Sequence, residues 1–298
     1  MNEKAMTLAS FAGDSLALGA HWVYDTKALA ETFGRVEELA KPLPNSYHPT
    51  KNAGEFTHYG DQAYVLLESL AAKKAFDLDD FAARWRELFN GYAGYVDNAT
   101  KNTLSQFAAG WGPLDAGSRS TDFAGAARIA PLVYLYRHDL DALLRSATLQ
   151  TQMTHNSPQV VEAACFLARA ATALLDGADI REAFSLAKAN AGDAQLASWV
   201  DLGLAAAGKD TVSTVAAFGQ SCHIDHAFPS VIQIAVSYEK DLRQALVASV
   251  MAGGDSAARN LALGMLLGAR LGLEAIPKTW LAGLRRHADI EKLLAGLG

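Results

Sequence analysis

The sequence has few cysteines and few charged residues. Among its 298 residues are two cysteines, and only 19% of residues are Asp, Glu, Lys or Arg. Cys165 lies in an apolar helical segment and Cys222 in a polar, loop-like one, so we expect no disulfide and two free thiols. The net charge of -6 and the scattered Lys and Arg side chains give no basic field for a polynucleotide. Nucleic-acid binding is therefore disfavoured, whereas a small anionic nucleotide is compatible with this charge.

The sequence also shows no membrane span and no secretory leader. No stretch is long enough and free enough of polar residues for a bilayer-spanning helix. The first 22 residues carry Lys4, but Asp14 interrupts their apolar run and no cleavage pattern follows. We therefore expect no membrane association and a cytoplasmic location.

Helical periodicity runs through almost the whole chain. Half of the residues are hydrophobic, and apolar residues recur at spacings of three and four, as in residues 161–171. No stretch shows sustained strand-type alternation. Ala-rich runs such as FLARAATALL combine high helix propensity with small side chains that allow close helix packing. Since no long linker or repeat interrupts the pattern, we predict an all-α, compact multi-helix bundle that forms a single domain over residues 1–298.

Seven short segments combine glycine with ionisable or amide side chains that helix packing does not require. Several precede a predicted helix, where free N–H groups favour an anion or an oxygen-rich ligand. Taken singly, Asp61 and Asp255 are typical helix N-caps, and His21 and His58 are typical histidines with satisfied hydrogen bonds. Their joint occurrence is what indicates a site. The segments are GDSLALGAHWVYD (13–25), YHPTKNAGEFTHYGDQ (47–62), GYVDNATKN (94–102), SRSTDFAGAAR (118–128), MTHNS (153–157), FGQSCHIDHAFPS (218–230) and AGGDSAARN (252–260).

The order and spacing of these segments resemble the ADP-ribosylglycohydrolase family over nearly the whole chain. GDSLALGAHW resembles the family's opening GDALG segment, and GEFTHYGDQ fits Gly-x-x-Thr-Asp-Asp-Thr-Gln-Met without gaps. VDNATK is similar to an Asp-x-x-x-Thr loop, STDFAGAARIAPL to a Gly-Asn-Gly-x-x-Met-Arg-x-x-Pro loop, and GGDSAAR to a Gly-Gly-Asp-Thr-Asp-Thr helix start. The resemblance implies an all-α fold whose cleft holds two divalent cations, usually magnesium or manganese. In the family these cations assist cleavage of the glycosidic bond of ADP-ribose.

The family's metal-binding carboxylates are largely replaced in this chain. His58 and Tyr59 stand where the Thr-Asp-Asp triplet has its two carboxylates. Asp255 is retained in the last motif, but Ala257 and Ala258 replace its second aspartate and second threonine. Because magnesium requires a nearly complete octahedron of oxygen ligands, we predict no magnesium pair.

The substitutions leave a polar set of side chains. His21 replaces an early glutamate of the family, and Arg259 places a fixed positive charge near the old metal position. The segments AHWVYD, FTHYGDQ, FGQSCH and GGDSAAR resemble the J-crystallin branch, and we infer that a ligand is still bound. The ligand-binding residues that we predict are Asp14, His21, Tyr59, Asp61, Gln62, Ser120, Asp122, Asp255, Ser256 and Arg259.

Two functions of different classes fit these residues. The first is hydrolysis of a glycosidic bond in an ADP-ribosylated or related nucleoside-type substrate, with little or no dependence on magnesium. There Asp97, which matches the family's loop carboxylate, acts as general base or orients the water, and His58 is the general acid. The second is a J-crystallin-like protein that binds a nucleotide or another small ligand without turnover. For Asp97, a plain helix cap is the competing interpretation.

A third alternative concerns the metal alone. One softer divalent ion on His21, His58 and Asp255 would replace the magnesium pair, because imidazole suits zinc, iron or nickel. The expected partner is a nucleotide or ADP-ribose-like small molecule, and the sequence predicts no particular oligomeric state.

Overall fold

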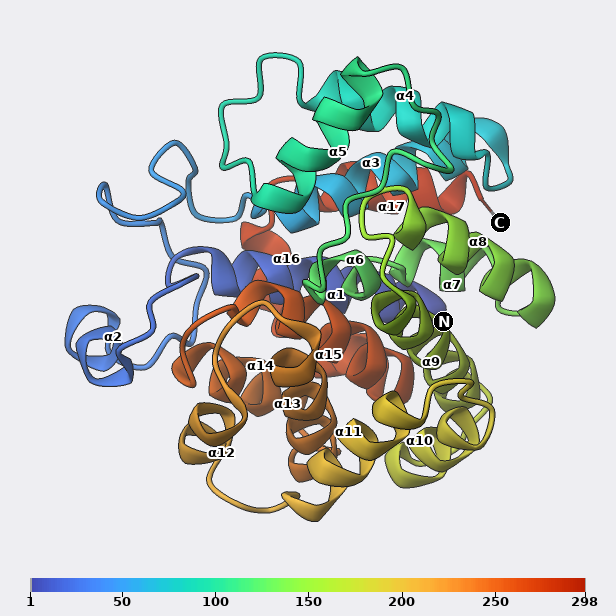
Figure 1. Ribbon diagram of the computed structural model, residues 1–298. Coiled ribbons are helices and arrows are strands. Elements are labelled where there is room, and N and C mark those ends of the chain that lie inside the picture. Colours follow the sequence, from blue (N-terminus) through green and yellow to red (C-terminus); the bar gives the residue numbers. More distant parts are fainter. Residues whose placement is uncertain (1, 298) are drawn as a thin grey trace.

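The prediction of an all-α fold is confirmed. The computed structural model describes residues 2–297, and within this range helices are joined by loops and two isolated β-bridges, without a β-strand. Figure 1 shows the arrangement of the helices. They are α1 (Asn2–Leu18), α2 (Thr26–Phe33), α3 (His58–Lys73), α4 (Leu78–Leu88), α5 (Asn98–Ala108), α6 (Ala124–Ala127), α7 (Ala130–Tyr136), α8 (Leu140–Gln152), α9 (Pro158–Leu175), α10 (Ile180–Ala189), α11 (Ala194–Ala205), α12 (Thr211–Phe218), α13 (Ile224–Ser237), α14 (Leu242–Met251), α15 (Ser256–Leu271), the 3-10 helix η1 (Leu273–Ala275), α16 (Lys278–Gly283) and α17 (His287–Ala295).

Aspartate side chains mark the start of many helices. In each of them a carboxylate oxygen accepts a backbone N–H of the first turn, which satisfies a donor that a helix start leaves free. The capping aspartates are Asp25, Asp77, Asp97, Asp139, Asp179, Asp193, Asp210, Asp241 and Asp255. Asp97 and Asp255 are therefore caps, and each has a second carboxylate oxygen for other contacts.

The helices α1 and α15 pack side by side through the middle of the molecule (Figure 1). Ser10 Oγ of α1 donates a hydrogen bond to the backbone oxygen of Leu261 at 2.8 Å. Gly264 and Gly268 allow the close approach, because a Cβ at either position would lie within 2.9 Å of α1 atoms. The pair positions the start of α15, where Asp255 lies, against the end of α1.

Gly264→Ala should destabilise the fold. Its Cβ would lie 2.2 Å from the backbone oxygen of Ala9, which cannot yield unless α1 shifts in a close-packed core. We expect the free energy of unfolding to fall by about 1–3 kcal/mol in urea denaturation. Gly192→Ala is the matched control, since the nearest atom to its Cβ would be 3.8 Å away. Equal stability of the two variants would contradict the close packing of α1 on α15.

The helix α9 corrects one expectation. By length and by its mean hydropathy of 1.2, this 18-residue helix could cross a membrane, whereas we expected no such segment from the sequence. In the structure 56% of it is buried, and it packs against α8, α10 and α15. The core helix of a globular protein passes the same test of length and composition, so α9 is weak evidence for a membrane span.

Two irregular segments bring side chains to the helix starts. Residues 19–25 follow α1, and their Trp22 N–H donates to the backbone oxygen of Gly254 at 2.9 Å. The N–H of Gly254 in turn donates to the oxygen of Val23 at 2.8 Å. Residues 34–57 connect α2 to α3 and carry Tyr47 and His48. The first segment is thus tied to the loop that precedes α15, and the second leads into α3.

Candidate functional site

The starts of three helices meet at one place. Thr57, Asp97 and Asp255 cap α3, α5 and α15. His58 and Tyr59 follow Thr57 directly, and they contact the side chains of Asp97 and Asp255, respectively. Residues from distant parts of the sequence therefore form one buried cluster, which we call the helix-start cluster: His21, His48, His58, Tyr59, Asp97 and Asp255.

A line of three side chains runs through this cluster. One oxygen of Asp97 accepts the N–H of Thr100 at 2.6 Å, and the other lies 3.1 Å from His58 Nε2. On the opposite edge of the His58 ring, Nδ1 lies 3.3 Å from His48 Nε2. In residues 2–297 two nitrogens of this line are buried without a hydrogen-bond partner: His58 Nε2, whose contact with Asp97 is an ion-pair contact, and His48 Nδ1 at the end of the line. The line thus ends in one nitrogen that is free for a ligand or water.

The charges along the line determine where its protons lie. Burial raises the pKa of Asp97, but the hydrogen bond and charge of His58 outweigh it and hold this pKa below its usual range. Burial, with smaller effects of His58 and Lys51, lowers the pKa of His48 to about 3. A proton on His58 Nε2 would face the Asp97 carboxylate, and in that tautomer His58 Nδ1 would accept the proton of His48 Nε2. His48 Nδ1 then presents a lone pair.

Asp255 is held by proton donors from the protein. Its Oδ1 accepts the N–H of Ala258 at 3.2 Å, and its Oδ2 accepts from Tyr59 Oη at 2.9 Å and from Trp22 Nε1 at 3.3 Å. Burial raises the pKa of Asp255, although Arg259 and Tyr59 oppose the shift. Every oxygen of this carboxylate therefore has a partner within the chain.

His21 stabilises the same helix start. Its Nδ1 accepts the N–H of Ala257 at 3.3 Å, and its ring stacks on Trp22 with centroids 4.4 Å apart. Burial, followed by the charges of His48 and His58, lowers the pKa of His21, so the ring is neutral with its proton on Nε2. That N–H is buried without a partner in residues 2–297.

Three aromatic rings cover the cluster, and we call them the aromatic cover: Trp22, Tyr47 and Tyr95. They pack edge to face, with centroids 4.9 to 5.5 Å apart, and Tyr95 and Trp22 each lie 5.4 Å from the ring of His58. Tyr47 is 54% exposed, so the cover faces solvent. A ligand that reaches His58 has to displace these rings.

Asp14 lies behind the site and positions it. Its carboxylate accepts the N–H and the hydroxyl of Thr57 at 2.8 and 2.6 Å, and Thr57 caps Tyr59. A Cβ at Gly60 would lie 2.3 Å from Asp14 Oδ2, so glycine is needed at that position. Burial raises the pKa of Asp14 to about 7. Asp14 thus supports the cluster through Thr57, and a direct contact of Asp14 with a ligand stays a prediction.

Gln62 contacts the cluster, since its Nε2 donates to the backbone oxygen of His58 at 2.9 Å, whereas Asp61 bonds to residues outside it. Asp61 pairs with Lys51 at 2.5 Å and accepts the hydroxyl of Tyr92. Gln62 Oε1 accepts from Trp85 at 2.8 Å and from Arg128 at 2.6 Å. Both side chains have partners in the protein, and their binding of a ligand stays a prediction.

Ser256 and Arg259 lie in the first turns of α15, and both are buried. The guanidinium of Arg259 donates to the backbone oxygens of Ser249 and Gly253 at 2.9 and 2.5 Å. Its charge lowers the pKa of Asp255, against the larger effect of burial. Arg259 thus supplies a fixed positive charge near Asp255, as the spacing indicates, but its hydrogen bonds go to the last turn of α14 and the loop after it. Ser256 Oγ has no hydrogen-bond partner in residues 2–297.

Ser120 and Asp122 lie at the edge of the cluster. Ser120 Oγ accepts the N–H of Asp122 at 3.1 Å. The charge of Asp122 contributes to raised pKa values of Asp255, Tyr59 and Cys222, for all of which burial is the larger cause. Asp122 is therefore a carboxylate close to the site, while Cys222 and Cys165 are free thiols, as we expected.

Sequence reasoning missed His48 and the aromatic cover as parts of the site. His48 lies in the 34–57 connection, and its contact with His58 depends on how this segment folds back. Tyr95 precedes Asp97 by two residues, which was the available signal. His155 was also missed: it is buried, and Asp97 affects its pKa, which burial lowers to about 4.

The residues do not fit the two-cation centre that the family resemblance implies. The positions of two carboxylates carry His58, which contacts Asp97, and Tyr59, which donates to Asp255. In residues 2–297 no three or more His, Cys, Asp or Glu side chains are placed to hold one metal ion. The single-ion alternative on His21, His58 and Asp255 is therefore not supported either.

Comparison with known proteins places this chain among relatives of one kind. The family model described as ADP-ribosylglycohydrolase matches residues 4–297. Crystallin J1A of Tripedalia cystophora is 25% identical, over 96% of this chain and 93% of that protein. ADP-ribosylhydrolase ARH3 of Mus musculus is 26% identical, over 86% and 80%. A solved structure titled "ADP-ribosylglycohydrolase-related protein complex" superposes with a TM-score of 0.80 and 25% identity, over 99% of this chain and 98% of that one.

Proposed function

Because this chain belongs to the ADP-ribosylglycohydrolase family, we propose that it hydrolyses the glycosidic bond of an ADP-ribosylated or related nucleoside-type substrate. In this proposal the reaction depends little or not at all on the family's two-magnesium centre. The observation that carries it is the line from Asp97 through His58 to His48, which ends in an imidazole nitrogen without a partner in residues 2–297. A cytoplasmic location and a nucleotide-like small-molecule partner belong to the same proposal.

The line supplies the proton transfers that glycoside hydrolysis needs. Water adds to the anomeric carbon, the bond to the leaving group breaks, and the leaving atom takes up a proton. His48 Nδ1 accepts a proton from the water, and the positive charge formed on the imidazoles is balanced by Asp97. The same nitrogen then returns the proton to the leaving group. Asp97 acts by orienting His58, since both of its oxygens are already bound.

The carboxylates near the line support the same reaction. The anomeric carbon develops positive charge as the bond breaks, and a nearby anion stabilises it. Asp122 is half-buried at the edge of the cluster, lies 3.8 Å from His223 Nδ1 and has the Cys222 thiol as a neighbour. It is the carboxylate available for this role, because Asp255 is occupied by Tyr59 and Trp22.

Chelation of divalent cations should leave the activity unchanged. We expect the release of ADP-ribose from N- and O-linked ADP-ribosyl peptides to differ less than twofold between EDTA and added magnesium. The physical reason is that the side chains of His58 and Tyr59 already occupy the carboxylates of Asp97 and Asp255, where a cation would otherwise bind. Chromatographic measurement of ADP-ribose tests this. A tenfold or larger loss of activity in EDTA would contradict the proposal of metal independence.

A second function is favoured by a different observation. The rings of the aromatic cover lie within 5.5 Å of one another, His58 and Asp255 are wholly buried, and this arrangement suits retention of a ligand as much as turnover. The likeness to crystallin J1A has the same implication. If ADP-ribose binds saturably in calorimetry but none of the peptides or free nucleosides is cleaved, the binding protein is the better description.

A further inference from the structure

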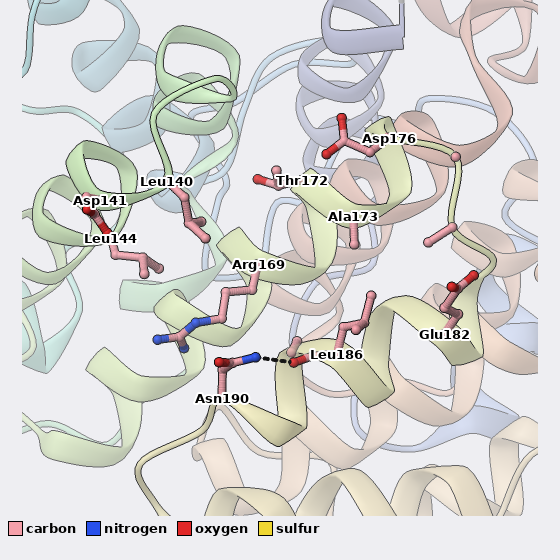
Figure 2. A pocket seen from close by; sticks show the side chains of 13 residues that line it. Leu140, Asp141, Leu144, Arg169, Thr172, Ala173, Asp176, Glu182, Leu186 and Asn190 are labelled. Carbon is pink, nitrogen blue, oxygen red and sulfur yellow. Dashed lines mark hydrogen bonds between the residues drawn. The ribbon is translucent and has the colours of Figure 1, made fainter.

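The helices α8, α9 and α10 form a groove that contains no residue of the helix-start cluster. It encloses about 750 Å³, within the ~300–1,000 Å³ that is usual for small-molecule sites. Its floor is the second half of α9, with Ala173 and Thr172. Leu140 and Leu144 of α8 line one side and Leu186 of α10 the other, as Figure 2 shows.

One end of the groove carries a cation with unused hydrogen-bonding capacity. The side chain of Arg169 is only 21% exposed, and its Nη1 lies 3.6 Å from Glu162 Oε1, beyond hydrogen-bond distance. This nitrogen is buried and has no hydrogen-bond partner in residues 2–297. A guanidinium offers five N–H donors in a planar fork that matches a carboxylate. Since burial of an unpaired donor is costly, a bound carboxylate would be stabilising here.

The opposite end of the groove is acidic. Asp176 and Glu182 lie there, across the groove from Arg169 (Figure 2). Asp176 is already paired with Arg137 at 2.9 Å, which leaves Glu182 as the acceptor for a ligand's ammonium group. Between the two ends the surface is apolar, and Leu140 and Leu186 are 42% and 52% exposed. Exposed leucines on both walls of one hollow indicate an apolar ligand body.

We propose that this groove binds a short apolar peptide with free termini. Its carboxylate pairs with Arg169, its ammonium group with Glu182, and its side chains pack against Leu140, Leu144 and Leu186. A fatty acid lacks the ammonium group and a polyamine lacks the carboxylate, so neither satisfies both ends. The site is separate from the proposed hydrolase function and stands or falls independently of it.

Isothermal titration calorimetry with trileucine tests the proposal. We expect saturable binding to the parent protein and at least tenfold weaker binding of trileucine amide, which lacks the carboxylate, since charge-assisted bonds are the strong ones. Arg169→Gln should weaken trileucine binding by a similar factor. Arg145→Gln is the matched control, because Arg145 lies on the exposed face of α8 and does not line the groove.

Each outcome of these titrations either supports or overturns the proposed peptide site. The amide comparison uses the unaltered protein, so it is decisive even if Arg169→Gln folds poorly, which a thermal melt would show. Absence of saturable trileucine binding overturns the proposal. So does equal affinity for trileucine and its amide, or an Arg169→Gln variant that is folded and binds as well as Arg145→Gln.

Discussion

Asp97→Asn should lower the turnover of the cleaved substrate by about 10²–10⁴-fold and leave the fold intact. Asparagine keeps the cap, because its oxygen can still accept the N–H of Thr100. Its amide N–H₂, however, donates towards His58 Nε2, which must then accept. The proton of His58 moves to Nδ1 and that of His48 to its own Nδ1, so the free lone pair is lost. The measurement is ADP-ribose release under saturating substrate.

A matched control separates the cap from the chemistry. Asp193 caps α11 through the N–H of Leu196 at 2.9 Å, and Asp193→Asn should affect stability by less than the ~0.5–2 kcal/mol of a lost cap without reducing turnover. Imidazole nitrogen shifts in NMR spectra report the tautomers of His58 and His48 without any substrate. Unchanged turnover and unchanged tautomers in Asp97→Asn would contradict the proposed role of the Asp97–His58–His48 line in proton transfer.

Asp14→Asn should gain stability relative to the parent protein as the pH rises, by on the order of 4 kcal/mol between pH 4 and pH 8. Burial raises the pKa of Asp14 from 3.8 to about 7, so the folded state binds this proton more tightly than the unfolded chain does. The resulting cost to stability is absent below pH 3.8, grows between pH 3.8 and 7, and is complete above 7. Asparagine does not ionise and avoids it.

The variant preserves the contacts of Asp14. The oxygen and the nitrogen of the asparagine amide take the positions of the two carboxylate oxygens. The oxygen can accept the N–H of Thr57, and the nitrogen can donate to the Thr57 hydroxyl. Urea denaturation at pH 4 and pH 8 gives the difference from the parent at each pH. Asp79→Asn, on an exposed first turn of α4, controls for the loss of one charge. A difference that stays constant with pH would show that Asp14 is not a buried acid of this kind.

The all-α fold was predictable because residues that are close together in the sequence determine where a helix forms. Apolar spacing, Ala-rich runs and aspartates ahead of helical segments gave the all-α fold, and the structure confirms it. Asp97 and Asp255 could be chosen for the same reason, since a capping position and a motif position coincide. Each has one oxygen on the cap and another on the site.

The rest of the site depends on contacts that local patterns do not encode. Asp61 is adjacent to the motif, but Lys51 and Tyr92 occupy its carboxylate. His48 lies ten residues before His58 and reaches it only because the 34–57 connection folds back. Such pairings follow from the path of an irregular segment, and periodicity says nothing about that path.

The pairing of α1 with α15 bears on how the chain acquires its structure during synthesis. The first helix emerges from the ribosome early, yet its partner lies about 250 residues later in the sequence. Until α15 is complete, the part of the α1 surface that α15 covers has no native partner, and closing so long a loop slows folding. The helix-start cluster therefore forms only after translation is nearly finished. In a chain truncated before residue 256, the N-terminal helix keeps exposed apolar surface, which is prone to aggregation and is a target for chaperones.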